Sequence, residues 1–309
     1  MAPYRVTQES MSRSALDGLQ SNLGRMQRLQ QKMTSGKEVS RPSDSPTDAV
    51  AAMQFRSDRK RTEQYGRNAQ DALGLLGAAD TTLTNSLESV GRIRELVLLG
   101  ANATSGPSER TAIAQEIKTI REGLVGLANT TYLNRPIFAG TAEPGALIPA
   151  QGAYDASGTY YGNSGPGSEV FRTVGPGGAK VQVNMAGPDV FGTGGTSLFQ
   201  VLSDIETRLR SGTDADIQTM ITTDLNNLDA RRLNVLNKLA EVGARYNRVE
   251  TMKTKAEDDL LQISNSLSQA EDIDLPKTIV DIQLQEVSYR AALSTTAKVI
   301  QPSLVDFLR

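Results

Sequence analysis

The sequence predicts a mainly α-helical protein: a long antiparallel helical bundle or coiled-coil rod that carries a small central β-rich inserted domain. Apolar residues recur at three- and four-residue steps over most of the 309 residues, which is the periodicity of amphipathic helices. The pattern stops in one central stretch, 141–196, which is dense in Gly and Pro. Because helical segments flank that stretch, both chain ends are expected at the same end of the rod.

The N-terminal arm begins with a heptad-like stripe formed by Leu16, Leu19, Leu23, Met26 and Met33. The arm then breaks near two prolines. Ser45 suits the position just before a helix, Pro46 suits its first residue, and Asp48 adds a carboxylate to its first turn. A long helix is expected from there toward Asn102. A turn at 104–107 leads into a further helix that opens near Glu109.

The C-terminal arm is expected to start with a helix near Ser197 and to continue as a long heptad pattern from Asp214 to Leu267. Pro276 should interrupt that pattern, because an interior proline loses a backbone hydrogen bond and clashes with the preceding turn. Asp274 can cap a fresh helix whose first turn tolerates the proline. The last stripe consists of Ile279, Ile282, Tyr289, Leu293 and Ile300, and Pro302 ends it.

These breaks divide the chain into five segments. Residues 1–44 form an N-terminal helix that pairs with the C-terminal helix, 45–140 and 197–272 form the two parts of the helical rod, and 273–309 form the C-terminal helix. The segment 141–196 carries short runs of β-forming residues at 159–161, 169–174 and 180–185, separated by Gly-Pro and Gly-Gly turns.

The composition argues against an enzyme. The chain has no cysteine and no histidine, which removes thiolate nucleophiles, the commonest general base and the commonest metal ligands. No cofactor or metal is expected, because neither glycine string is followed by the lysine of a phosphate-binding loop and neither acidic cluster has calcium-loop spacing. A net charge of −2 and one short basic run at 56–61 give no footprint for nucleic acid. The apolar runs are too short for membrane insertion.

The apolar stripes have two interpretations: a single intramolecular core, or surfaces that only a neighbouring chain covers. The two terminal stripes are the best candidates for the second interpretation, because each lies outside a proline-marked break and a lone coiled-coil strand cannot bury its own seam; the pattern alone leaves both interpretations open. Leu304, Phe307 and Leu308 follow Pro302 and extend this predicted assembly interface. The N-terminus lacks the charged and apolar regions of a cleaved signal peptide, which predicts a cytoplasmic protein or one exported by another route.

Several strings resemble the flagellin superfamily. Residues 33–46, Met-Thr-Ser-Gly-Lys-Glu-Val-Ser-Arg-Pro-Ser-Asp-Ser-Pro, are similar to its N-terminal signature, and 289–309 are similar to its C-terminal helix. Within the superfamily, Arg41 to Pro46, the loop 129–140 and the ending 304–308 resemble the hook–filament junction branch more than flagellin itself. Ser45, Pro136 and Pro276 depart from the branch pattern. The insert is the part expected to vary.

The resemblance implies a structural subunit of the bacterial flagellum and no catalysed reaction. It implies an extracellular location at the hook–filament junction, reached through the flagellar type III export apparatus without a cleaved signal peptide. The implied partners are copies of the chain in a ring, hook-associated protein 1, flagellin, and an export chaperone that binds the C-terminal region. A short flagellin that forms the filament itself is the nearest alternative, followed by an unrelated coiled-coil adaptor and an enzyme.

Overall fold

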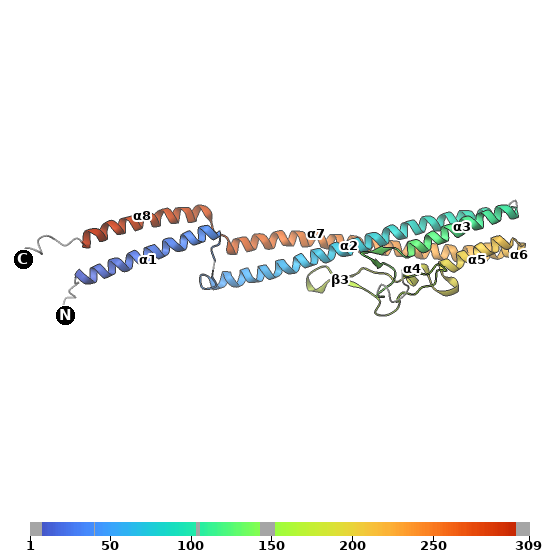
Figure 1. Cartoon of the computed structure of the whole chain (residues 1–309), viewed down its shortest axis with the longest axis horizontal. Helices are drawn as coiled ribbons and strands as arrows, with labels where there is room; N and C mark the ends of the chain where they lie inside the picture. Colours follow the sequence, from blue (N-terminus) through green and yellow to red (C-terminus); the bar gives the residue numbers. More distant parts are fainter. Residues whose placement is uncertain (1–7, 40, 103–105, 143–151, 301–309) are drawn as a thin grey trace, which may run out of the picture. The chain divides into compact units, whose positions relative to one another are not determined.

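A computed structural model describes residues 8–39, 41–102, 106–142 and 152–300. Long helices dominate, and the few strands are short, so the prediction of a mainly α protein with a small β region is confirmed (Figure 1). The chain forms two compact units: one combines residues 1–61 with 260–309, and the other comprises residues 62–259. Two helices, α2 (Pro46–Gly100) and α7 (Leu225–Glu271), contribute to both units.

The unit that contains the chain ends is built around α1 (Gln8–Ser35) and α8 (Leu275–Ile300), which lie side by side (Figure 1). Pro276 is the second residue of α8, where a missing backbone N–H costs nothing. The Asp274 carboxylate accepts a 3.1 Å hydrogen bond from the backbone N–H of Lys277, which caps the new helix. The side chain of Gln285 donates to the carbonyl of Asn22 at 3.1 Å and so links the two helices.

The unit 62–259 has a continuous hydrophobic core shared by α2, α7, α3 (Pro107–Ala128) and α5 (Leu198–Ser211). Ion pairs connect the same helices: Arg94 lies 2.8 Å from Asp229 at the surface, and the largely buried Arg121 lies 3.5 Å from Glu206. The helix α6 (Asp214–Thr219) runs through a π-helical turn, η3 (Met220–Asp224), into α7. The core therefore requires segments that are far apart in the sequence.

The central segment contains two small antiparallel pairs. Strands β1 (Thr131–Tyr132) and β2 (Arg135–Pro136) form a hairpin that the sequence analysis did not predict, and β3 (Phe171–Thr173) pairs with β4 (Lys180–Gln182). The turn between β3 and β4 includes a 3-10 helix, η1 (Pro176–Gly178). A short helix, α4 (Gly187–Phe191), and a second 3-10 helix, η2 (Gly194–Thr196), lead into α5. The predicted run at 159–161 supplies only a bridge between Tyr154 and Tyr160.

An aromatic cluster anchors this segment to the helices. Tyr154 contacts the rings of Tyr160, Phe191 and Phe199 at centroid distances of 5.1, 5.8 and 5.1 Å, and Phe138 packs edge-on against Phe191. The Tyr154 hydroxyl is buried and has no hydrogen-bond partner among the described residues, and burial raises its pKa far above the ordinary value. The Tyr160 hydroxyl instead donates to the carbonyl of Phe138 at 3.1 Å.

The two tyrosines should respond oppositely to loss of the hydroxyl. Tyr154→Phe removes an unsatisfied buried polar group and should raise the free energy of unfolding by about 1 kcal/mol. Tyr160→Phe leaves a carbonyl with one partner fewer and should lower the free energy of unfolding by about 1 kcal/mol. Urea denaturation of both variants measures the difference. Equal losses of stability would show that the Tyr154 hydroxyl is bonded.

Candidate assembly interface of the terminal helices

The facing sides of α1 and α8 carry the predicted terminal stripes, and the pair covers them only in part. Leu19, Met26, Ile282 and Tyr289 are half-buried. The other described stripe residues, Leu16, Leu23, Met33, Ile279 and Leu293, are each 38–48% exposed. The side chain of Ile300 and the residues Leu304, Phe307 and Leu308 lie outside the part that the structure describes. Two helices alone therefore leave much of this apolar surface in water.

Helix α8 carries a second apolar stripe that the sequence analysis missed. Val280, Leu284 and Val287 are 53%, 61% and 65% exposed. At about 100° per residue, these three positions lie on the side of α8 opposite to Ile282 and Tyr289. The sequence contains this second stripe as apolar residues at the helical spacing i, i+4, i+7. Only the contact with α1 shows which of the two apolar faces of α8 is left exposed. Exposed apolar faces of this kind mark contacts with another protein.

The joint between the terminal helices and the rest of the chain is held by backbone hydrogen bonds. α1 ends at Ser35, and Gly36 adopts a φ of 69°, which glycine adopts without steric cost. The backbone N–H of Glu38 donates to the carbonyl of Glu271 at 2.6 Å, and the N–H of Ile273 donates to the carbonyl of Gly36 at 3.2 Å. The break between α1 and α2 and the break between α7 and α8 are therefore hydrogen-bonded to each other and form one structural element.

Ion pairs reinforce this joint. The Lys37 ammonium lies 3.1 Å from the Glu271 carboxylate and 2.6 Å from that of Asp272, and the Arg56 guanidinium lies 2.7 Å from Glu271. The Glu271 side chain is 4% exposed, so its charge needs these cations. The sequence analysis placed a helix boundary at 272–274 and considered Arg56 only as part of a basic run without a nucleic-acid role. It missed the ion pairs because 234 and 235 residues separate Lys37 from its two partners.

The joint shifts three pKa values. Burial alone would raise the pKa of Glu271, but its interactions with Arg56 and Lys37 outweigh burial and lower that pKa. Hydrogen bonds from Lys37 and Ser268 lower the pKa of Asp272. Hydrogen bonds to Asp272 and then Glu271 raise the pKa of Lys37. The carboxylates therefore stabilise the joint above their unfolded pKa values of about 4, and this stabilisation is lost as the pH falls through the lower folded values.

We expect the joint to open in acid before the core of residues 62–259. Hydrogen exchange should show that the amides of Glu38 and Ile273 lose protection between about pH 5 and pH 2, where both carboxylates take up protons. Glu271→Gln should weaken protection already at pH 7 and flatten its pH dependence. Glu257→Gln, on the exposed side of α7, is the matched control. Equal pH profiles for the wild type and Glu271→Gln would contradict the assignment.

No cluster of carboxylates among the described residues is arranged to hold a metal ion. In the same ranges, no helix is both long and apolar enough to cross a membrane. The glycine strings form the turn before β4 and the loop before α5. The unit that contains the chain ends therefore combines an apolar two-helix surface with a charged joint at residues 36–38, Arg56 and 271–273.

Comparisons with known proteins agree with this arrangement. The bacterial flagellin N-terminal helical region matches residues 6–143. Flagellar hook-associated protein 3 of Salmonella typhimurium is 22% identical over 94% of this chain and 95% of its own length. The chain is thus similar to bacterial flagellins in its N-terminal helical region and to hook-associated protein 3 along nearly its whole length. Its similarity to a flagellin of Clostridium tyrobutyricum, 26% identical, is confined to 49% of this chain and 40% of the relative.

Solved structures of the superfamily have the same fold. A flagellar hook-associated protein of Vibrio parahaemolyticus superposes with a TM-score of 0.65, at 21% identity, over 74% of this chain and 100% of that one. The shared fold agrees with the sequence match to hook-associated protein 3, which runs along nearly the whole of both chains.

Proposed function

We propose that this protein is a structural subunit of the bacterial flagellum that joins the hook to the filament. The observation that carries the proposal is the extent of the similarity: it spans 94% of this chain and 95% of hook-associated protein 3. A flagellin B of Vibrio cholerae matches 87% of this chain but only 59% of its own length, and the Clostridium flagellin matches 40% of its own length. A junction subunit acts by shape, because it must fit the hook on one side and the filament on the other. The family is structural, and no reaction is part of the proposal.

The terminal helices are the proposed assembly surface. A neighbouring helix that covers Val280, Leu284 and Val287 would bury apolar surface at about 25 cal/mol per Å², and this gain offsets the entropy lost when the chain ends become ordered. The proposed partners are further copies of the chain in a ring, hook-associated protein 1 on the hook side and flagellin on the filament side.

The proposed route out of the cell is the flagellar type III apparatus, without a cleaved signal peptide. The C-terminal region, including 273–309, is the proposed binding site for an export chaperone. Exposed apolar residues on both faces of α8 support this assignment, because such a helix needs a cover before assembly as well as after it.

Electron microscopy of a deletion strain tests the junction assignment. The expected phenotype is hooks without filaments, with flagellin lost to the culture medium. A short flagellin is the alternative, and it would appear along the whole length of sheared filaments in immunogold labelling. A junction subunit would be labelled only at the filament base. Normal filaments in the deletion strain would contradict both assignments.

A further inference from the structure

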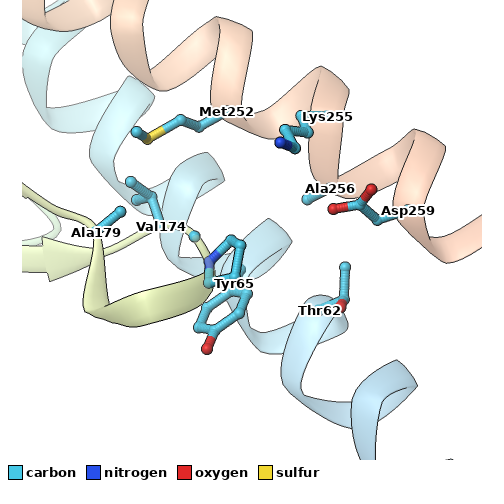
Figure 2. A pocket seen from close by; sticks show the side chains of 10 residues that line it. Thr62, Tyr65, Val174, Ala179, Met252, Lys255, Ala256 and Asp259 are labelled. Atoms are coloured by element: carbon cyan, nitrogen blue, oxygen red, sulfur yellow. The ribbon is translucent and has the colours of Figure 1, made fainter. Parts of the chain in front are cut away.

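One end of the unit 62–259 carries an apolar notch with a cavity of about 260 Å³. Tyr65 of α2 and Met252 of α7 line it (Figure 2), as does Pro176 of the turn before β4. Lys255 and Asp259 lie one helical turn apart on α7 at the same notch (Figure 2). Neither side chain has an ion-pair partner in the described ranges. The apolar notch is therefore bordered by a cation and an anion that can each form an ion pair with another chain.

The opposite end of the same unit carries the complementary feature. Leu98 and Leu99, at the end of α2, are 45% and 53% exposed. Glu95 precedes them by about one turn on the same side of the helix, and its side chain is 72% exposed. Arg92, a further turn back, is 54% exposed. Its guanidinium pairs with the carboxylates of Glu95 at 3.4 Å and of Glu116 at 2.9 Å. This end is thus an apolar projection followed by an anion and then a cation.

The charges of the two ends match in register. When the α2 end of one copy enters the notch of another, the entering α2 and the receiving α7 run antiparallel. Leu99 beside Met252 then places Glu95 near Lys255 and Arg92 near Asp259, since the spacings of three to four residues are nearly equal on the two helices. Both contacts are attractive. The reverse order of charges on either helix would make both repulsive.

We propose that the notch receives the Leu98–Leu99 end of a second copy of this chain, in a head-to-tail contact. Such a contact is heterologous, so it produces rings or helical arrays rather than closed dimers. The inference rests on the proposed role as a repeated flagellar subunit and names the surface through which copies meet. It is separate from the terminal-helix interface, because both complementary features lie within residues 62–259.

Disulfide trapping tests the contact directly, because the chain has no cysteine of its own. Full-length chains with Leu99→Cys are mixed with full-length chains with Ala179→Cys, whose side chain lies in the notch. Within one copy, the part of α2 between Tyr65 at the notch and Leu99 is about 50 Å long, so a bond between the two cysteine positions joins two copies. Docking should enrich the mixed disulfide about tenfold over a control pair of Ala179→Cys with Thr119→Cys, which is exposed on α3.

Charge reversal separates docking from random collision. Glu95→Lys or Lys255→Glu alone should reduce the mixed disulfide about fivefold, and a chain that carries both changes should recover it. Yields that match the control pair, or that ignore the reversals, overturn the proposal. Each of these failures is independent of the deletion phenotype that tests the junction role.

Discussion

Gly140→Ala should destabilise the unit 62–259 by about 2–5 kcal/mol, because it combines backbone strain with a steric clash. Gly140 has a φ of 68°, in the left-handed region that an alanine adopts only at a cost. A β-carbon there would lie 2.0 Å from the backbone carbonyl oxygen of Asn163, which cannot rotate away as a side chain could. Thermal and urea denaturation of the full-length variant measure the loss.

Gly177→Ala is the matched control. Gly177 has nearly the same backbone conformation, with a φ of 69°, but no atom lies within 4 Å of a β-carbon built there. The control should therefore lose only the strain contribution of about 1–2 kcal/mol. The difference between the two variants isolates the contact between Gly140 and the loop at Asn163. Similar losses in both variants would mean that this loop is not packed against Gly140.

The helices were predictable because their boundaries depend on local chemistry. Pro46 and Pro107 occupy the first residues of α2 and α3, Pro276 the second residue of α8, and Asp274 caps α8, all within a few residues of where the sequence placed them. Each of these signals acts over one turn of helix. A single sequence contains all the information that such a boundary needs.

The central segment was less predictable because its structure depends on distant contacts. The sequence marked β-forming runs at 169–174 and 180–185, yet only three residues of each pair. Asn184 leaves the ladder to bond the carbonyl of Ser168 and the N–H of Val170, and the aromatic cluster draws in α4 and α5. Gly140 is part of the loop 129–140 that resembles the family. The steric need for glycine there comes from the backbone carbonyl of Asn163, 23 residues away.

Only part of the candidate interface could be predicted, because covering a stripe also depends on distant contacts. Periodicity identified the stripes that face each other on α1 and α8, because they share one spacing. It could not show that Val280, Leu284 and Val287 have no cover, since a stripe in the sequence does not reveal its partner. Similarly, the charges of Lys37 and Glu271 were visible, but their pairing depends on the fold that brings two distant helix breaks together.

The second apolar face of α8 leads to the prediction with the largest effect on assembly. Leu284→Asp combined with Val287→Asp should leave the melting curve of the isolated protein nearly unchanged, because exposed substitutions usually alter stability by less than about 0.5 kcal/mol each. In an assembled subunit the same aspartates would be buried against apolar groups, which costs several kcal/mol per uncompensated charge. The variant should therefore fail to support filaments. Accumulation in the culture medium would assign the effect to assembly, and retention in the cell would assign it to the chaperone contact proposed for the same helix.

Gln283→Asp combined with Ser288→Asp is the control for added charge. It introduces the same two carboxylates into the same part of α8, at exposed positions that flank the apolar face. This control should support filaments and motility, because its aspartates can remain in water at the edge of the contact. Loss of filaments in both double variants would mean that charge anywhere on α8 is harmful. A melting temperature lowered by several degrees in Leu284→Asp/Val287→Asp alone would mean that the face belongs to the subunit core, since only buried positions contribute that much to stability.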